Sequence, residues 1–200
     1  MINETVFRNV LKTIKELPER SLDIIDSFSD NQFKSKEKLL EKIDALLDKE
    51  TDVAILGCWY GSILVPSIAP KVKQIIAVDL DNDVVRVGKN KFFKEFENVN
   101  WSTGDVFVKE LNYSNVNLVI NTSCEHMRPM KDWPFWNRVR PGTAFAVQSN
   151  NMHWIEGHVN CVDSLEEFKM QLPAGSEIIH QEEIEDTRGI RYTLIGKINE

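Results

Sequence analysis

The 200-residue chain is poor in cysteine: it has only Cys58, Cys124 and Cys161, and no Cys-x-x-Cys pair. An odd number of widely spaced cysteines argues against both a disulfide framework and a structural zinc site. We therefore expect three free thiols in a reducing compartment.

Long apolar runs are also absent. No run approaches the roughly 20 residues that a helix needs to cross a bilayer, and residues 1–20 lack the uninterrupted apolar core of a signal peptide. We expect no membrane partner and a cytoplasmic location.

Positive charge is in deficit, because 31 Asp and Glu face 24 Lys and Arg, for a net charge of −7. Nucleic acid would meet overall repulsion from such a chain unless a basic stripe offset it, and the basic residues are scattered. The composition therefore favours a small-molecule substrate, makes nucleic acid an unlikely partner, and leaves the oligomeric state open.

The first fifty residues have a helical pattern. Apolar residues recur at intervals of three and four in residues 3–17 and again in 35–50. Pro18 marks the end of the first helix, and Ser35 is a candidate N-cap for the second. We expect residues 1–50 to form a helical extension that packs on a domain of residues 51–200.

From residue 52 the period changes to that of short strands. Apolar or β-branched runs at 52–58, 74–80, 99–106, 117–123 and 143–149 alternate with helical or turn segments. Such alternation predicts an α/β fold with parallel strands joined by crossovers. Residues 176–186 and 188–199, joined by the turn Asp-Thr-Arg-Gly, predict an antiparallel hairpin. Residues 163–173 predict one more helix, capped by Asp163 or Ser164.

Glycines and acidic residues follow the first three strands. Gly57 and Gly61 end the first, Asp79 lies 22 residues beyond Gly57 at the end of the second, and Asp105 follows the third. In a doubly wound sheet ligands bind beyond the carboxyl ends of the strands, where these residues converge. Asp79 can accept ribose hydroxyl groups, whereas Asp81 is better placed to cap the next helix. The glycine turn alone could be only a tight corner.

In this order the segments LGCWYGS, AVDLD, GDV, NLVINTS, RPGTAFAVQS and RYTLIGK resemble the Rossmann-like S-adenosylmethionine-dependent methyltransferases, over roughly residues 50–198. The resemblance implies a doubly wound, mostly parallel seven-stranded sheet with an antiparallel C-terminal hairpin, and S-adenosylmethionine as cofactor. One departure is Trp59, which occupies the place where a central glycine normally sits.

The resemblance also assigns cofactor contacts to individual residues. It implies that the turn with Gly57, Trp59 and Gly61 faces the methionine part of the cofactor. Asp79 is then expected to hold the ribose and Asp105 to touch the adenine. We include Asn121, at the end of the fourth strand, among the cofactor-binding residues.

Two polar loops carry the candidate catalytic residues. In the resembled methyltransferases the loop after the fourth strand borders the transferable methyl group, and here it contains Glu125 and His126. Methyl transfer needs a positioned, deprotonated nucleophile, so either residue is a candidate base. His158 and Asn160, after the fifth strand, are candidates for orienting the acceptor. The alternative is that these loops are capped and solvated without chemistry.

The same loops raise two further possibilities. His126 and His158 could hold a metal ion with Cys124, Cys161 or Glu125, but no recognised ligand spacing is present, so we predict no metal. A group of aromatic residues could form either the wall of a substrate pocket or part of the core. This aromatic group is Trp133, Phe135, Trp136 and Trp154.

We therefore expect an S-adenosylmethionine-dependent methyltransferase acting on a small molecule. Three alternatives remain: transfer of another group from the same cofactor, an NAD-dependent oxidoreductase, and a non-catalytic nucleoside-binding protein. The missing middle glycine, Asp105 and the reversed last strand disfavour NAD. The signature of nucleic-acid amine methylation, Asp or Asn followed by two prolines and an aromatic residue, is absent after the fourth strand.

Overall fold

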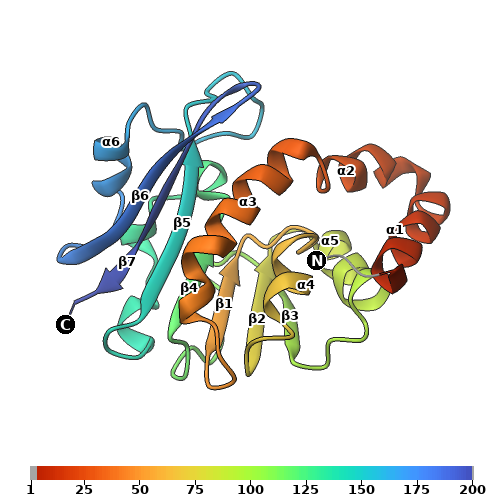
Figure 1. Cartoon of the computed structure of the whole chain (residues 1–200), viewed down its shortest axis with the longest axis horizontal. Helices are drawn as coiled ribbons and strands as arrows, with labels where there is room; N and C mark the ends of the chain where they lie inside the picture. The colour runs from red at the N-terminus through yellow and green to blue at the C-terminus, as the bar shows by residue number, and fades with distance from the viewer. Residues whose placement is uncertain (1–3, 200) are drawn as a thin grey trace.

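A computed structural model describes residues 4–199. The chain opens with the helices α1 (Glu4–Glu16), α2 (Ser21–Asp26) and α3 (Asp30–Ile43), with single 3-10 turns at Pro18–Arg20 and Asp44–Leu46. They form an arch along one side of the molecule (Figure 1). Within residues 4–199, no helix is long and apolar enough to cross a membrane.

Ser35 does not cap a helix, so that prediction is wrong. Helix α3 begins at Asp30, five residues earlier, and Ser35 is buried inside it with its hydroxyl donating to the carbonyl of Gln32 at 3.2 Å. The helical repeat of apolar residues begins after the start of α3, because the first turn of this helix is polar on the side that faces the cavity described below. A polar first turn has no apolar repeat that sequence reasoning can detect.

One seven-stranded sheet forms the centre of the molecule, in the order β3-β2-β1-β4-β5-β7-β6. The strands β1 to β5 are parallel, and β7 pairs antiparallel with β5 on one side and β6 on the other. The predicted fold class is confirmed. The strand bounds are β1 Asp52–Leu56, β2 Gln74–Asp79, β3 Val99–Thr103, β4 Leu118–Asn121, β5 Ala144–Asn150, β6 Ser176–Asp186 and β7 Gly189–Ile198.

The connections are short helices and turns. Asp81 caps α5 (Asn82–Val87) by accepting the amides of Asp83 at 2.8 Å and Val84 at 3.3 Å, as predicted. Ser164 caps α6 (Leu165–Lys169). The remaining connections are α4 (Leu64–Ile68), a π-turn at Gly88–Phe92, and 3-10 turns at Cys124–His126, Met130–Asp132 and Trp136–Arg138.

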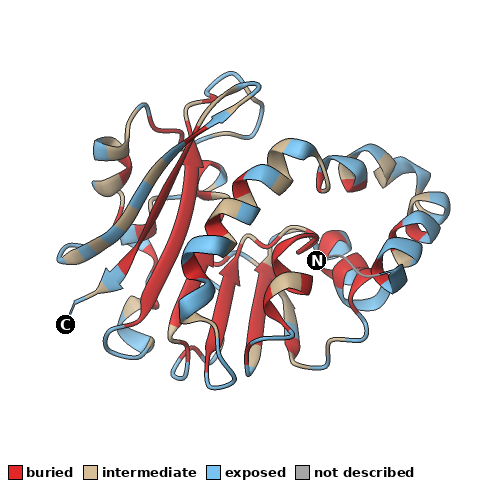
Figure 2. Ribbon diagram, in the orientation of Figure 1, coloured by how far each residue is buried: buried red, intermediate tan, exposed pale blue. Residues whose placement is uncertain are grey.

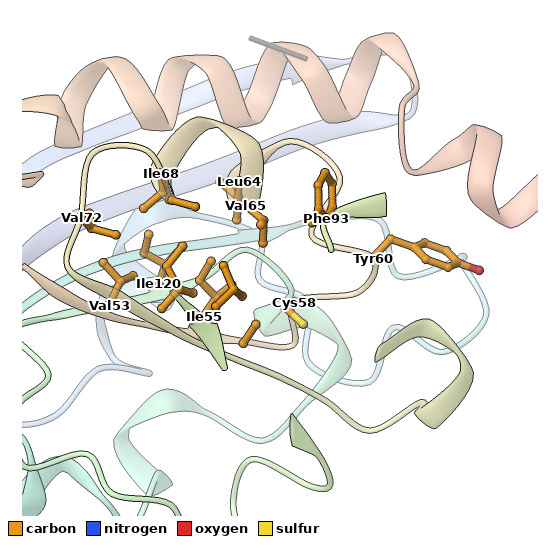
Figure 3. Packing of buried hydrophobic residues seen from close by; sticks show 14 of the residues in the cluster. Val53, Ile55, Cys58, Tyr60, Leu64, Val65, Ile68, Val72, Phe93 and Ile120 are labelled. Atoms are coloured by element: carbon orange, nitrogen blue, oxygen red, sulfur yellow. The ribbon is translucent and has the colours of Figure 1, made fainter. Parts of the chain in front are cut away.

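Two hydrophobic cores lie on opposite faces of the sheet, because successive strand residues point to opposite sides. In β1, Val53 and Ile55 enter the first core, whereas Ala54 and Leu56 enter the second. The three central strands β1, β4 and β5 are buried along their whole length (Figure 2). Figure 3 shows side chains of the first core, with Tyr60 extending its hydroxyl group away from the aliphatic cluster.

The N-terminal helices belong to the first core. Val6 and Val10 of α1, Ile24 of α2, and Leu39 and Ile43 of α3 are all buried in the same cluster as the sheet residues. At about 25 cal/mol per Å² of apolar surface, five such side chains contribute several kcal/mol of burial free energy. The three helices therefore cover one face of the sheet and help to bury its apolar side chains.

Candidate active site

A cavity of about 700 Å³ lies beyond the carboxyl ends of the parallel strands. Its walls include residues that follow each strand from β1 to β5, and residues of α2 and α3 cover it. The volume falls within the roughly 300–1,000 Å³ typical of small-molecule sites. This position, at the strand ends of a doubly wound sheet, is where ligands of such folds bind.

The glycine turn forms one wall. Gly57, Trp59 and Gly61 all line the cavity and have φ angles of 65°, 50° and 67°. These values lie in the left-handed region, which glycine adopts freely and a tryptophan only at a cost of about 1–2 kcal/mol. Trp59 therefore has a backbone conformation that usually favours glycine. Its ring packs partly against the first core.

Asp79 holds the turn in place. One carboxylate oxygen accepts the amide of Trp59 at 2.6 Å and the other accepts the amide of Asp81 at 3.0 Å. Burial raises the pKa of this carboxyl group, and the two amide hydrogen bonds oppose the rise. Asp79 also lines the cavity, so one side chain fixes the turn and faces the space beside it.

Asp105, in the loop after β3, lines the same cavity. One of its carboxylate oxygens accepts the amide of Phe107 at 2.8 Å, which fixes the loop after β3. Leu80 and Phe107 add apolar surface here, and the guanidinium of Arg128 lies 4.4 Å from the Phe107 ring centroid. This end of the cavity offers flat apolar walls with a carboxylate beside them. Sequence reasoning missed Leu80, Phe107 and Arg128, although Leu80 directly follows the acid of β2.

Asn121 does not line the cavity. It is fully buried, its amide nitrogen lies 3.0 Å from the sulfur of Met127 and 3.1 Å from that of Met130, and its carbonyl oxygen accepts the amide of Ser123. Its role is to shape the loop after β4. The neighbours Thr122 and Ser123 line the cavity instead, while the Asn121 side chain lies against Met127 and Met130.

Glu125 is a buried carboxylate at the other end of the cavity. Its side chain is 4% exposed, and Oε1 accepts the amide of Asn150 at 2.7 Å and lies 3.3 Å from Nη1 of Arg191. The other oxygen, Oε2, is buried without a hydrogen-bond partner. A buried carboxylate oxygen without a partner is costly unless a ligand or solvent satisfies it.

His126 and His158 lie beside Glu125 with their ring centroids 4.6 Å apart. Nδ1 of His126 is 3.1 Å from the carbonyl of Gly157, and Nδ1 of His158 is 3.1 Å from the carbonyl of Met152. A carbonyl can only accept, so each Nδ1 carries the proton and each Nε2 of a neutral ring keeps its lone pair. Burial lowers the pKa of His158, which favours its neutral form.

We call Glu125, His126 and His158 the Glu–His–His cluster. One candidate ligand atom from each lies within 4.8 Å of the others. All three line the cavity, so the structure brings together three of the four predicted catalytic residues.

Asn160, the fourth, does not line the cavity. Its amide group exchanges hydrogen bonds with Gln171 at 2.8 and 2.9 Å and donates to the carbonyl of Cys124 at 3.3 Å. The carbonyl of Glu125 accepts the backbone amides of Val159 and Asn160. Asn160 thus helps to join the loop after β4 to the loop after β5 from outside the cavity.

Lys36, Arg188 and Arg191 form a cationic wall that sequence reasoning missed. Lys36 comes from α3 and bonds Gln32, and burial, with Arg191 nearby, lowers the pKa of its ammonium group to about 7. Arg191 is 4% exposed and its Nε has no partner. A basic residue at the start of a hairpin strand gives no sequence signal, because only the fold brings it to the cavity.

The aromatic residues Trp133, Phe135, Trp136 and Trp154 do not line this cavity. Trp133 and Phe135 are buried with Tyr113 in the second core, and Trp136 packs against the same cluster. Trp154 is 67% exposed. Core packing, one of the two predicted alternatives, therefore accounts for three of them.

Similar folds occur among solved structures. N-methyltransferase NodS from Bradyrhizobium japonicum WM9, in complex with S-adenosyl-L-homocysteine, matches 86% of this chain and 89% of its own with a TM-score of 0.69 and 13% identity. An S-adenosylmethionine-dependent methyltransferase from Aquifex aeolicus matches 94% of this chain and 97% of its own with a TM-score of 0.64 and 20% identity.

A putative methyltransferase from Bacillus halodurans C-125 matches 82% of this chain and all of its own with a TM-score of 0.66 and 13% identity. No protein-family model and no curated protein matches the sequence. At these identities the similarity is one of fold, and the fold is that of the class I S-adenosylmethionine-dependent methyltransferases.

Proposed function

We propose that the protein is an enzyme that binds S-adenosylmethionine and transfers its methyl group to a small-molecule acceptor. The observation that carries the proposal is the convergence of the Gly57–Gly61 turn, Asp79 and Asp105 on one cavity in this fold. Structural relatives with the same strand architecture include a protein in complex with S-adenosyl-L-homocysteine, which supports the choice of cofactor.

The cofactor would lie along the ends of β1 to β3. The methionine part faces the turn of Gly57, Trp59 and Gly61, the ribose lies beside Asp79, and the adenine lies near Asp105. Each carboxylate oxygen of Asp79 already accepts one backbone amide. The ribose hydroxyls would therefore donate to the remaining lone pairs of these two oxygens. Leu80 and Phe107 supply apolar surface for the base.

The acceptor would lie at the Glu–His–His cluster. An SN2 methyl transfer requires the acceptor's lone pair to be free and in line with the methyl group, so the site must take a proton or keep it away. Nε2 of His126 has the free lone pair that a base needs, on an exposed side chain. Oε1 of Glu125 is already bound by Asn150 and Arg191, and its unpaired oxygen, Oε2, is buried. We assign the base to His126 and the orienting role to His158.

A small acceptor is supported by the shape and charge of the site. Helices α2 and α3 contribute Asp26, Gln32 and Lys36 to the cavity wall, and Ser27, directly after α2, adds to it, so the space is covered. The net charge of −7 opposes association with nucleic acid. An acceptor with an anionic group would find Lys36 and Arg191 beside it.

Titration calorimetry with S-adenosylmethionine, S-adenosylhomocysteine and NAD tests the cofactor. We expect micromolar affinity for the first two and none for NAD. Asp79→Asn should weaken binding more than roughly tenfold, because the neutral amide is a poorer acceptor. Asp83→Asn is the matched control, since Asp83 is exposed, pairs with Arg86 and does not line the cavity. No measurable binding of either S-adenosylmethionine or S-adenosylhomocysteine would overturn the proposal.

A screen of acceptors with radiolabelled cofactor then tests the base. His126→Ala should lower kcat by about 10²-fold or more while cofactor affinity stays unchanged. Full activity of this variant would remove His126 from the mechanism.

A further inference from the structure

The Glu–His–His cluster has the composition and geometry of a metal site. Two imidazoles and one carboxylate are a ligand set used for divalent transition metals, and their candidate ligand atoms lie within 4.8 Å of one another. Ideal tetrahedral zinc ligands lie roughly 3.4 Å apart, for bonds of about 2.1 Å. The cluster must therefore contract by about 1 Å around an ion, and the exposed side chain of His126 can supply that movement.

Both histidines have the tautomer that metal-binding histidines usually have. The Nδ1 protons of His126 and His158 are held by the backbone carbonyls of Gly157 and Met152, each at 3.1 Å. This arrangement fixes the tautomer and leaves Nε2 as the donor atom, as in most metal-binding histidines.

Glu125 supplies an independent observation. The side chain is 4% exposed, and its Oε2 is buried with no hydrogen-bond partner, although Oε1 has two. Native proteins rarely leave a buried carboxylate oxygen unpaired. A cation would satisfy it, and Arg191 and Asn150 would then hold the ligating carboxylate in position.

We propose that Glu125, His126 and His158 bind a divalent transition-metal ion at the acceptor end of the cavity. The ion takes Nε2 of each histidine and the carboxylate of Glu125, and its remaining coordination positions face the cavity. No recognised ligand spacing is visible in the sequence because two ligands are adjacent and the third lies on another loop. Only the pairing of the loops after β4 and β5 brings them together.

The ion would also provide a second way to deprotonate the acceptor, and this inference rests on the proposed function. A hydroxyl or amine group bound to the ion loses its proton more readily, because the positive charge lowers the pKa of the group. Nε2 of His126 is then a ligand, and the proton passes to solvent or buffer. A metal-dependent transfer and a His126-dependent base are thus distinct predictions for the same side chain.

Metal binding can be measured without cofactor or acceptor. Protein stripped with a chelator is titrated with Co²⁺ and its visible absorption is recorded, followed by competition with Zn²⁺. We expect one equivalent to bind with nitrogen and oxygen ligands and without a thiolate charge-transfer band. His126→Ala should weaken the affinity more than roughly tenfold. Thermal unfolding confirms that each variant is folded.

His153→Ala is the matched control. His153 lies on the same loop as His158, but it pairs with Asp163 at 2.8 Å and does not line the cavity, so its loss should leave the affinity unchanged. Three results would overturn the site: no binding up to millimolar Co²⁺, equal weakening by His153→Ala and His126→Ala, or a thiolate band from Cys124 or Cys161. If stripped protein still binds S-adenosylmethionine in calorimetry, the cofactor proposal stands without the metal.

Discussion

Gly61 turns the chain where a side chain has no room. Its φ is 67°, and a Cβ atom would lie 2.6 Å from Cγ2 of Val65 and 3.0 Å from the Trp101 ring. Gly61→Ala should therefore lower the free energy of unfolding by about 2–4 kcal/mol, from backbone strain plus overpacking. Gly142 has a φ of 74° and open space around it, so Gly142→Ala should cost only about 1 kcal/mol. Urea unfolding measures both, and equal losses would contradict the steric argument.

The three cysteines are predicted to be unreactive in the folded protein. Cys58, Cys124 and Cys161 are buried, and burial raises the pKa of each thiol, to about 11 for Cys161. The thiolate is the reactive form, so its population near pH 8 is very small. A colorimetric thiol reagent should titrate all three in urea and react slowly with each in buffer. Rapid labelling of a single thiol in buffer would show that burial does not control reactivity there.

At the scale of elements, the Tyr60 hydroxyl is one of the groups that connect α2 to the glycine turn; Ser27, which follows α2, and Ser62 form another hydrogen bond between them. Tyr60 donates to Asp23 of α2 at 2.7 Å and accepts from Nε of Arg20 at 3.0 Å, while Arg20 also pairs with Asp81. Tyr60→Phe should cost about 1–2 kcal/mol of stability, because Asp23 and Arg20 each lose a partner. Because α2 lines the cavity in which we propose that the cofactor binds, the affinity for S-adenosylmethionine should also fall.

Tyr113→Phe is the control for this substitution. The Tyr113 hydroxyl is buried without a hydrogen-bond partner, so its removal should leave stability unchanged or raise it. Thermal melts of the two variants, run in parallel, compare the hydroxyl groups directly. An equal loss in both would mean that the network around Tyr60 contributes nothing specific.

Strands were easier to predict than helix starts. Buried strands such as β1 and β2 are short apolar runs ended by glycine or aspartate, and both features are visible in the sequence. The start of α3 was misplaced at Ser35 because its first turn is polar and faces the cavity. The division of the chain at residue 50 stays a prediction, although the N-terminal helices share a core with the sheet.

The site was predictable only where it lies on regular elements. Gly57, Asp79 and Asp105 end strands, so their convergence follows from the topology. Asn121 and Asn160 are polar and close in sequence to the site, which predicts that they belong to it, but their side chains bond Met130 and Gln171 and do not line the cavity. Lys36 and Arg191 reach the cavity through α3 and β7, and such tertiary contacts between distant segments leave no local pattern.

For the whole molecule, Lys36 should make stability depend on pH. Its pKa is about 7 in the folded chain, because of burial and then Arg191, and about 10.4 in an unfolded chain. The unfolded chain therefore binds the proton more tightly, and stability should rise as the pH increases from about 7 to about 10.

Lys36→Met tests this coupling. The variant should be more stable than wild type by about 1–2 kcal/mol near pH 7, and the difference should shrink toward pH 10. Lys42→Met, on the exposed side of the same helix, should follow the wild-type profile. Urea unfolding between pH 6.5 and 10 gives both curves, and a constant difference across this range would exclude Lys36 as the titrating group.

The insertion of β7 between β5 and β6 sets an order of events during synthesis. Strand β5 and Glu125 leave the ribosome long before residues 189–198, which supply the neighbour of β5 and the cationic partner Arg191. Until then β5 has an open edge, and the carboxylate of Glu125 lacks its counter-charge. A nascent chain that stalls near residue 186 would thus expose an aggregation-prone edge, and the Glu–His–His cluster becomes complete only when the last strand is in place.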